Sequence, residues 1–432
     1  MYPNPIPTPN PDCRKTLQEQ ARPFVSSIYT ADPAASVGLD GRLYIYPSHD
    51  MDPARGCDCM DRYHIFSTED MKHFRDEGEI LRSDDLPWGR PEGGFMWAPD
   101  CRAAKDGKYY FYYPHPDGSR WNDTWKIGVC VSDRPGTGYR DLGFIEGIGG
   151  FCMIDPSIFL DTDGTPYLYY GGGGMSRAVI LEEDMKTVKG GKVYEIEGLE
   201  DFHEAPYLFL RNGIYYLTYS DNVPGRNRMH YATASTPLGP FVHRGVYLEA
   251  TGSDTSHGSV VEYKGHWYCF YHICAISGRG NLRSICVDEL FFEPDGSIRT
   301  VIQKGMPYES DPFDYSVLRA LRPSDALRDP HFPDLSGSGS AVLAGERRLI
   351  FTKVDGGDEG RVSLHFGYRT DALCHIQLIV NETDWSFVNL SPDRERTSFT
   401  VPLRSGKRNR LEIRFCDGGG ELTEIRLEPL DG

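Results

Sequence analysis

The 432-residue chain lacks any run of about 20 consecutive apolar residues, so no segment is expected to span a membrane. It also lacks an excess of positive charge. Its 46 Lys and Arg stand against 63 Asp and Glu, which leaves a formal net charge of −17 at pH 7. This sign disfavours nucleic acid, an anionic membrane and polyanionic substrates as partners. No long helical pattern is evident, so we expect an all-β chain.

The N-terminus lacks the apolar core of a secretory signal and is instead rich in proline. The 11 cysteines are scattered, and no C-x-x-C pair is present. We therefore expect mostly buried, reduced thiols and a cytoplasmic protein. Two alternatives stay open: a periplasmic or secreted protein whose signal was removed, and a Cys57–Cys59 disulfide in such a protein.

What the sequence does contain is a repeat in which a glycine opens an aromatic run, as in Gly107-Lys-Tyr-Tyr-Phe-Tyr-Tyr. In four of the five repeats the glycine follows Asp or Asn, which is a strong hairpin signal. Successive glycines are 66, 57, 49 and 52 residues apart. A hairpin repeat of about 50 residues indicates propeller blades, so we predict a five-bladed β-propeller. The five glycines are Gly41, Gly107, Gly164, Gly213 and Gly265.

A carboxylate stands nine residues before three of these glycines, at Asp32, Asp155 and Glu204. The other two repeats have Ala98 and Ser256 at this position. In a propeller the innermost strand of each blade lines the central channel, so equivalent positions converge. Packing alone hardly explains three acids there, because a buried charge costs several kcal/mol unless it is paired or used.

Glycoside hydrolysis uses two carboxyl groups on opposite sides of the bond that is cleaved. The protonated one donates its proton to the leaving oxygen, and the ionised one activates water or attacks the anomeric carbon. A third carboxylate raises the pKa of the acid by repulsion. Glu204 has the longest reach and is assigned as the acid. Asp32 would then be the base and Asp155 the group that tunes the pKa, although spacing alone does not fix this order.

Several segments resemble the signatures of glycoside hydrolase family 43, in the order of that family and within a five-repeat frame. The resemblance covers about 26–305 and implies a five-bladed propeller with an inverting mechanism. It gives Asp32 as general base, Asp155 as pKa modulator and Glu204 as general acid. The segments are Ala31-Asp32-Pro33, Ser48-His49-Asp50, Trp97-Ala98-Pro99-Asp100, Ile154-Asp155-Pro156-Ser157, Phe202-His203-Glu204-Ala205-Pro206, Ser256-His257-Gly258-Ser259 and Leu282-Arg283-Ser284.

The same resemblance implies further site residues. Trp97 is a candidate for stacking on a sugar ring, and Arg283 for contacting the substrate or the acids. His49 and Asp50 are candidates for lining the sugar pocket. His257 is expected to face a structural calcium ion at the propeller axis, coordinated mostly by water. No organic cofactor is expected.

The aromatic repeat ends before the C-terminal region, where short alternating strands are typical of a β-sandwich. We predict an N-terminal arm at 1–25, the propeller at 26–305, a linker at 306–340 and a sandwich at 341–432. The sandwich resembles carbohydrate-binding module family 6 through Gly360-Arg-Val-Ser-Leu-His-Phe-Gly-Tyr, Val380-Asn381 and Asn409-Arg-Leu-Glu-Ile. That resemblance makes Tyr368, Trp385 and Phe387 candidate glycan contacts. The alternative is a sandwich that binds nothing.

The expected function is an exo-glycosidase that removes terminal α-L-arabinofuranosyl or β-D-xylosyl residues from arabinoxylan or xylo-oligosaccharides. The expected partner is thus a plant cell-wall oligosaccharide or polysaccharide, and the sequence leaves the oligomeric state open. One alternative is an endo-α-1,5-L-arabinanase, which needs an open groove. A different class is a glycan-binding propeller without turnover.

Overall fold

The structure is a computed structural model that describes residues 21–51, 58–118, 120–221, 223, 226–305, 319–357, 360–406 and 409–430. These residues form an all-β protein, as expected from the sequence. No helix among them is long and apolar enough to cross a membrane. The helices in these ranges are single 3-10 turns: η2 (Ser83–Asp85), η3 (Trp121–Asp123) and η4 (Pro323–Asp325).

The chain divides into two compact units. The first consists of Met1–Phe24, Tyr29–Glu69 and Ile80–Pro307, and the second of Val25–Ile28, Asp70–Glu79 and Tyr308–Gly432. The predicted domain boundaries stay predictions. Most of the predicted N-terminal arm and much of the predicted linker lie outside the described residues.

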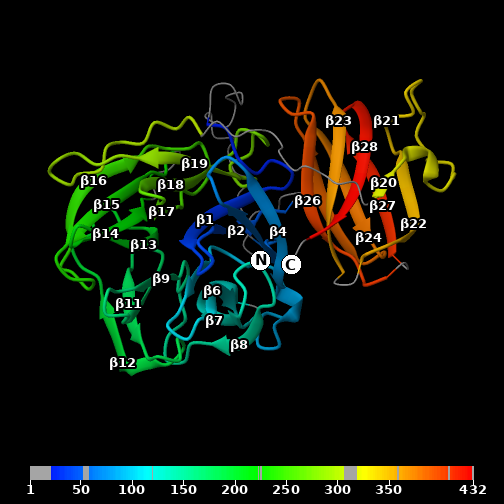
Figure 1. Ribbon diagram of the computed structural model, residues 1–432. Helices are drawn as coiled ribbons and strands as arrows, with labels where there is room; N and C mark the ends of the chain where they lie inside the picture. The colour runs from blue at the N-terminus through cyan, green and yellow to red at the C-terminus, as the bar shows by residue number, and fades with distance from the viewer. Residues whose placement is uncertain are drawn as a thin grey trace. The chain divides into compact units, whose positions relative to one another are not determined.

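Five antiparallel sheets follow one another along the chain, each made of consecutive strands (Figure 1). The first is β1 (Thr30–Val37), β2 (Leu43–His49), β3 (Arg62–Thr68) and β4 (Phe74–Arg82). The second is β5 (Asp100–Ala103), β6 (Tyr109–Pro116), β7 (Trp125–Ser132) and β8 (Arg140–Phe144). The third is β9 (Ser157–Leu160), β10 (Pro166–Tyr170), β11 (Arg177–Leu181) and β12 (Val188–Glu195). The fourth is β13 (Glu204–Arg211), β14 (Ile214–Ser220), β15 (Met229–Ala234) and β16 (Val242–Leu248). The fifth is β17 (Ser259–Tyr263), β18 (His266–Ile273) and β19 (Ser284–Leu290).

The turn between the first and second strand of every sheet contains one of the five repeat glycines. Their φ angles lie between 77° for Gly213 and 83° for Gly164, a region that glycine enters without steric cost. The five predicted hairpins are thereby confirmed. The aromatic runs form the second strand of each sheet, and many of their rings are buried in the hydrophobic core. Tyr112 and Tyr169, for example, are both 0% exposed.

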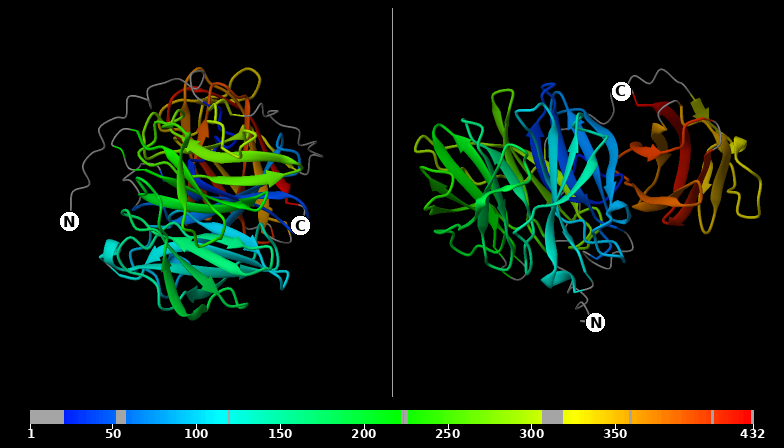
Figure 2. Two further views of the ribbon diagram at one scale, coloured as in Figure 1. Left: turned by 90° about the vertical axis from the view of Figure 1, so that its left-hand side faces the viewer. Right: turned by 90° about the horizontal axis from the view of Figure 1, so that it is seen from below.

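The first strands of the five sheets contact one another in a closed cycle. β1 contacts β5, β5 contacts β9, β9 contacts β13, β13 contacts β17, and β17 returns to β1. Figure 2 shows these sheets from two further sides. Because the first strands meet in this way, side chains at their starts can reach a common space although they are far apart in the sequence.

The second unit contains two antiparallel sheets that share one apolar core. One consists of β20 (Arg319–Leu321), β28 (Gly420–Pro429), β23 (Arg361–Arg369) and β26 (Arg396–Pro402), with β21 (Ala341–Leu343) also paired to β28. The other is β22 (Arg348–Val354), β27 (Asn409–Asp417), β24 (Cys374–Val380) and β25 (Asp384–Leu390). Phe366 from the first and Ile413 from the second are both almost fully buried in the shared core.

Two expectations for individual residues are corrected. Tyr368 is 1% exposed and its hydroxyl bonds the backbone of Ser391, so it is part of the core and offers no surface to a glycan. Its place in the alternation of β23 puts it on the inner face. Cys59 is a free thiol, which contradicts the alternative of a Cys57–Cys59 disulfide, while Cys57 itself lies outside the described residues.

Candidate active site

Asp32 lies near the start of β1, where the pairing of β1 with β2 is interrupted. The register shifts between Ala31 and Ala34, and Asp32 has a φ of 51°, in the left-handed region. A bulge of this kind turns a side chain away from the alternation of a regular strand. The Ser48 hydroxyl on β2 donates to Oδ2 of Asp32 at 2.5 Å, which helps to fix the carboxylate.

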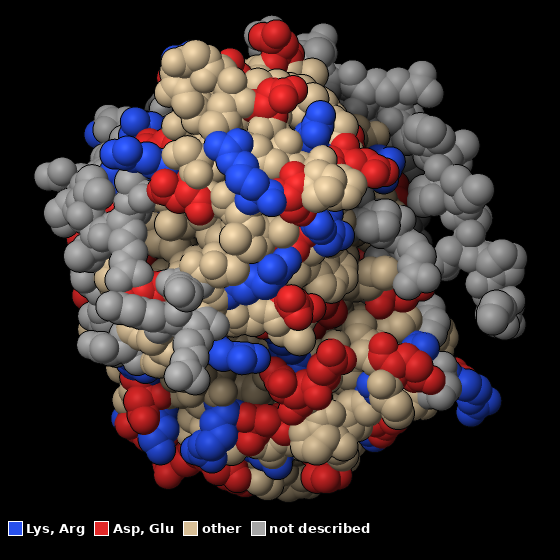
Figure 3. Space-filling view, turned by 90° about the vertical axis from the view of Figure 1, so that its right-hand side faces the viewer, with Lys and Arg blue, Asp and Glu red and all other residues tan. Residues whose placement is uncertain are grey.

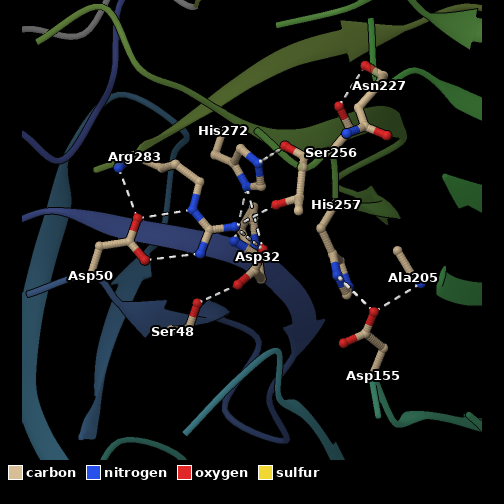
Figure 4. A network of polar contacts seen from close by, with 12 residues as sticks. Asp32, Ser48, Asp50, Asp155, Ala205, Asn227, Ser256, His257, His272 and Arg283 are labelled. Atoms are coloured by element: carbon tan, nitrogen blue, oxygen red, sulfur yellow. Dashed lines mark hydrogen bonds and ion pairs between the residues drawn. The ribbon is translucent and has the colours of Figure 1, made fainter. Parts of the chain in front are cut away.

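The Arg283 guanidinium lies between the carboxylates of Asp32 and Asp50 (Figure 4). Its Nε and Nη2 donate to the two oxygens of Asp50 at 2.9 and 2.8 Å. Its Nη1 donates to Oδ1 of Asp32 at 2.8 Å and to the Thr255 hydroxyl at 2.9 Å. The side chain is 9% exposed. Every guanidinium nitrogen thus has an acceptor within the protein, and Asp50 serves as an anchor for Arg283.

This arrangement keeps Asp32 ionised. Burial, the largest effect, would by itself raise the pKa of Asp32. The charge of Arg283, together with smaller contributions from His272, His257 and the Ser48 hydroxyl, outweighs it and lowers the pKa to about 2. Burial lowers the pKa of His272 to about 3, so this imidazole is neutral at pH 7. The Asp32 backbone N–H donates to Nδ1 of His272 at 3.1 Å, and Nε2 of His272 donates to the Thr255 carbonyl at 2.8 Å.

Asp155 and Glu204 occupy the corresponding positions of two other sheets. Asp155 precedes β9 with a φ of 54°, and Glu204 opens β13, whose pairing with β14 shifts register between Glu204 and Tyr207. The Ala205 backbone N–H donates to Oδ2 of Asp155 at 2.9 Å (Figure 4). That bond joins the two segments that carry the acids.

These two carboxyls have raised proton affinity. Burial first, and then the negative charges of Glu204 and Asp32, raise the pKa of Asp155 well above its ordinary value. Burial and the charge of Asp32 raise the pKa of Glu204 to about 7. Since Asp155 and Glu204 interact, they titrate as a pair, and this pair retains a proton at a pH at which Asp32 is fully ionised.

One ionised and one protonated carboxyl in the same site are what general acid–base chemistry requires. The Glu204 side chain is 17% exposed and the Asp155 side chain 6%. Glu204 is therefore better placed to meet a molecule from solvent, while Asp155 lies deeper. His203 also contacts the acid, with Nε2 at 3.4 Å from Oε2 of Glu204.

His257 lies against Asp155, with Nδ1 at 3.7 Å from Oδ2, and burial lowers its pKa to about 4. Within the described ranges, no three His, Cys, Asp or Glu side chains are arranged to hold a metal ion. Calcium takes six to eight oxygen ligands, so a cation beside His257 would depend mainly on water. These residues do not form a protein cage. We assign no reaction step to a cation, and the calcium role of His257 stays a prediction.

The comparisons with known proteins support the same chemistry. The sequence profile of Glycosyl hydrolases family 43 matches residues 21–298, which is more than half of the chain. The chain belongs to glycosyl hydrolase family 43. It is accordingly a glycoside hydrolase, and the matched range contains the three carboxylates, Arg283 and His257.

Curated relatives in family 43 cover about two thirds of the chain. A xylosidase/arabinosidase of Bacteroides ovatus is 34% identical over 333 residues, which are 66% of this chain and 98% of that protein. A β-xylosidase of Xylanibacter ruminicola is 33% identical over 329 residues, 65% of this chain and 99% of that protein.

Solved structures agree. A family 43 β-xylosidase/α-arabinofuranosidase from a compost metagenome, in complex with xylotriose and in a calcium-free form, is 34% identical with a TM-score of 0.59. The match covers 65% of this chain and 97% of the chain of the compost protein. An arabinoxylan arabinofuranohydrolase from Bacillus subtilis covers 97% of this chain and 100% of that one, with a TM-score of 0.58. At 22% identity it shows the fold alone.

Two further candidates from the family 43 resemblance lie beside this constellation. The Trp97 carbonyl accepts a hydrogen bond at 2.6 Å from the Tyr63 hydroxyl. Burial raises the pKa of Tyr63, and the charges of Asp32 and Asp155 add to this effect. The Trp97 ring lies 4.4 Å from that of Trp125. It is partly exposed, so the stacking role stays a prediction.

His49 is buried on β2, opposite Thr30, and it contributes to lowering the pKa of Asp61. Its role as a pocket residue stays a prediction. Sequence reasoning missed His272 and Thr255, which hold Asp32 and Arg283. The one available signal for His272 was a polar residue at the end of the aromatic run of β18.

Replacing Arg283 by Gln tests the electrostatic role of this residue. The pKa of Asp32 should rise once the cation is removed. Because a general base must be ionised, the acidic limb of the kcat/KM profile should then move to higher pH by about one to three pH units. The profile is measured on a nitrophenyl glycoside from pH 3 to 9.

The matched control is Arg299→Gln, which removes a 58% exposed guanidinium paired with Glu293. It should leave the profile unchanged. If the acidic limb of Arg283→Gln lies at the same pH as that of Arg299→Gln, the proposed effect of Arg283 on the pKa of Asp32 is contradicted.

Proposed function

We propose that this protein is an inverting exo-glycosidase that removes terminal α-L-arabinofuranosyl or β-D-xylosyl residues from arabinoxylan or xylo-oligosaccharides. The observation that carries the proposal is the opposite tuning of two carboxyls in one site, with a pKa of about 2 for Asp32 and about 7 for Glu204. That division of roles is the one glycoside hydrolysis needs.

In the proposed reaction Asp32 is the general base and Glu204 the general acid. A water molecule beside Asp32 attacks the anomeric carbon while its proton passes to the carboxylate. The bond from that carbon to the glycosidic oxygen breaks, and Glu204 transfers its proton to the departing oxygen. The configuration at the anomeric carbon is inverted because attack and departure occur on opposite faces.

Asp155 is proposed to tune and orient the acid. Its bond to the Ala205 N–H fixes the backbone next to Glu204, and because the two carboxyls repel each other when both are ionised, the pair holds a proton more strongly. Arg283 and Asp50 are proposed to hold the base. Whether either also contacts the sugar, as the family resemblance implies for both, belongs to the same proposal.

For the architecture, we propose that the five sheets are the blades of a five-bladed propeller and that the two-sheet unit is a β-sandwich. The closed cycle of first strands supports the first part, and the shared core of the two sheets supports the second. The carboxylates would then lie around the axis at the end where β1, β9 and β13 begin.

The substrate assignment draws on the relatives. The Bacteroides ovatus protein is a xylosidase/arabinosidase, and the compost structure contains xylotriose. An arabinoxylan arabinofuranohydrolase of Bacillus subtilis is also related, at 29% identity over 65% of this chain and 64% of that protein. A plant cell-wall glycan is therefore the proposed partner. On the face in Figure 3 acidic and basic side chains are interspersed, without a dominant single-sign field.

The remaining expectations stay proposals. Glycan binding by the second unit would rest on Trp385, 39% exposed, and Phe387, whose ring lies 5.7 Å away at 81°. A water-coordinated structural calcium would rest on His257 alone among the described residues. The cytoplasmic location is a further proposal. The disulfide at Cys274 is more typical of oxidising compartments, which favours the exported alternative.

Replacing Glu204 by Gln tests the enzymatic proposal. Without a proton donor, turnover of xylotriose should fall by about 10²- to 10⁴-fold. The loss should be smaller on nitrophenyl β-D-xyloside, because a nitrophenolate departs with little protonation. Sugar release from both substrates is compared at pH 6.

Glu262→Gln, a change at an exposed carboxylate of β17, is the control and should retain wild-type turnover. Wild-type turnover of xylotriose by Glu204→Gln would exclude Glu204 as the acid. Binding of xylotriose without hydrolysis by the wild-type protein would favour the non-enzymatic alternative, and release of internal arabinan fragments would favour the endo-arabinanase.

The stereochemistry provides a separate test. For an inverting enzyme the carboxyls of Asp32 and Glu204 should lie about 6.5–9.5 Å apart, with space for a water molecule between. Proton NMR of a β-D-xyloside digest should then show α-D-xylose as the first product, before mutarotation. Initial formation of β-D-xylose would contradict the inverting assignment.

A further inference from the structure

The second sheet has no carboxylate at the position of the three acids, where Ala98 stands instead. Its first strand β5 nevertheless carries two charged side chains directly afterwards. Asp100 is 1% exposed, and the Arg102 side chain is 18% exposed. Their nearest oxygen and nitrogen atoms are 3.5 Å apart. Because burying charge is costly, two such residues on a four-residue strand need an explanation.

Asp100 connects β5 to the strand that follows Asp155. Its Oδ2 accepts the Ile158 backbone N–H at 2.9 Å, and its Oδ1 accepts the Cys101 backbone N–H at 2.7 Å. Ile158 stands three residues after Asp155. The Asp100 carboxylate therefore holds the backbone at the start of β9, just after one of the three acids.

Arg102 connects β5 to the strands of the other two acids. Its Nη1 donates to the Ala35 carbonyl at 3.1 Å, and its Nη2 donates to the Tyr207 hydroxyl at 2.5 Å. The Tyr207 hydroxyl in turn donates to the same Ala35 carbonyl at 3.1 Å. Ala35 stands three residues after Asp32, and Tyr207 three residues after Glu204.

The common offset of three residues coincides with the irregular starts of β1 and β13. Ladder pairing is lost between Ala31 and Ala34 and between Glu204 and Tyr207. Strand pairing alone therefore does not fix where the acids lie relative to each other. The hydrogen bonds of Asp100, Arg102 and Tyr207 hold β1, β9 and β13 at or just beyond the point where regular pairing resumes.

We propose that Asp100, Arg102 and Tyr207 form a three-residue bridge of positioning residues that sets the separation of the base Asp32 from the acid Glu204. The inference rests on the proposed function. None of the three needs to touch the substrate. Displacing a reacting group by about 1 Å costs on the order of 10²-fold in rate, so small shifts of these strands are enough to affect turnover.

Burial and electrostatics support a bridge that stays intact during catalysis. Burial raises the pKa of Tyr207 to about 12, so its hydroxyl keeps the proton that it donates to Ala35. The Arg102 guanidinium also lies 5.6 Å from the centre of the Tyr207 ring. Burial raises the pKa of Asp100 and the charge of Arg102 opposes this effect, so the bridge pairs one cation with one buried carboxyl group.

The test uses Tyr207→Phe and Arg102→Lys in the full chain. Tyr207→Phe keeps the ring and removes the hydroxyl, and Arg102→Lys keeps the charge and removes the two-armed geometry. The control is Tyr216→Phe, which removes a buried hydroxyl of the same sheet that donates to the Gly296 carbonyl at 2.7 Å. Each protein is assayed on xylotriose, whose leaving group needs a proton, for kcat, KM and pH profile, and its thermal unfolding is measured.

For both bridge variants we expect kcat to fall by about 10- to 100-fold with KM within about twofold of wild type. The alkaline limb of kcat/KM should also move, because Asp32 contributes to the raised pKa of Glu204 and its distance changes. Tyr216→Phe should lose stability to a similar extent as Tyr207→Phe while keeping kcat and the limb.

The proposal is overturned if kcat of Tyr207→Phe matches that of Tyr216→Phe, or if kcat falls while the limb stays in place. Tyr207→Phe decides alone if Arg102→Lys does not fold. A wild-type protein without activity on any of the xylosides or arabinofuranosides would instead defeat the proposed function itself, so the two failures are distinguishable.

Discussion

The candidate site depends on one buried cation. Arg283 is shared between Asp32 and Asp50, and all its guanidinium nitrogens have acceptors. Removing one partner from such a buried network typically costs about 3–5 kcal/mol, because the remaining charge is left uncompensated. The same guanidinium opposes the effect of burial on Asp32 and keeps it ionised. Asp50 supplies the second negative charge that allows the cation to remain in this position. Stability and electrostatic tuning therefore arise from the same contacts.

For Asp155 and Glu204, burial and the neighbouring charges together raise the pKa, in contrast to Asp32. Asp155 and Glu204 are buried and lie close to each other and to Asp32, so burial and repulsion both favour protonation. Carboxyl groups of the same chemical kind thus divide into an ionised base and a proton-holding pair. The difference arises from the surroundings of each carboxyl rather than from residue type, and the Arg283 charge beside Asp32 is the largest of the contributions that lower its pKa. This division is the physical reason for assigning hydrolysis with separate acid and base.

Sequence reasoning predicted the parts of this arrangement that local chemistry determines. The hairpins followed from glycines at positive φ, and the three acids followed from their equal distance to those glycines. Contacts between sheets were not predictable in this way. Arg102 and Tyr207 are 105 residues apart, and Asp32 and His272 are 240 apart, with no shared local pattern. Tyr368 was misjudged because an aromatic residue in a strand is equally compatible with a core and a surface.

The most direct test of the account is a titration of the carboxyl groups themselves. Protein labelled with ¹³C in the Asp and Glu carboxyls would be followed by NMR between pH 3 and 9, with Asp32→Asn and Glu204→Gln used to assign the two signals. The account predicts that Glu204 titrates near pH 7 while the Asp32 signal remains that of an ionised carboxylate down to the lowest pH. A Glu204 signal that titrates near its ordinary value of 4.5, or an Asp32 signal that titrates near 3.8, would contradict it.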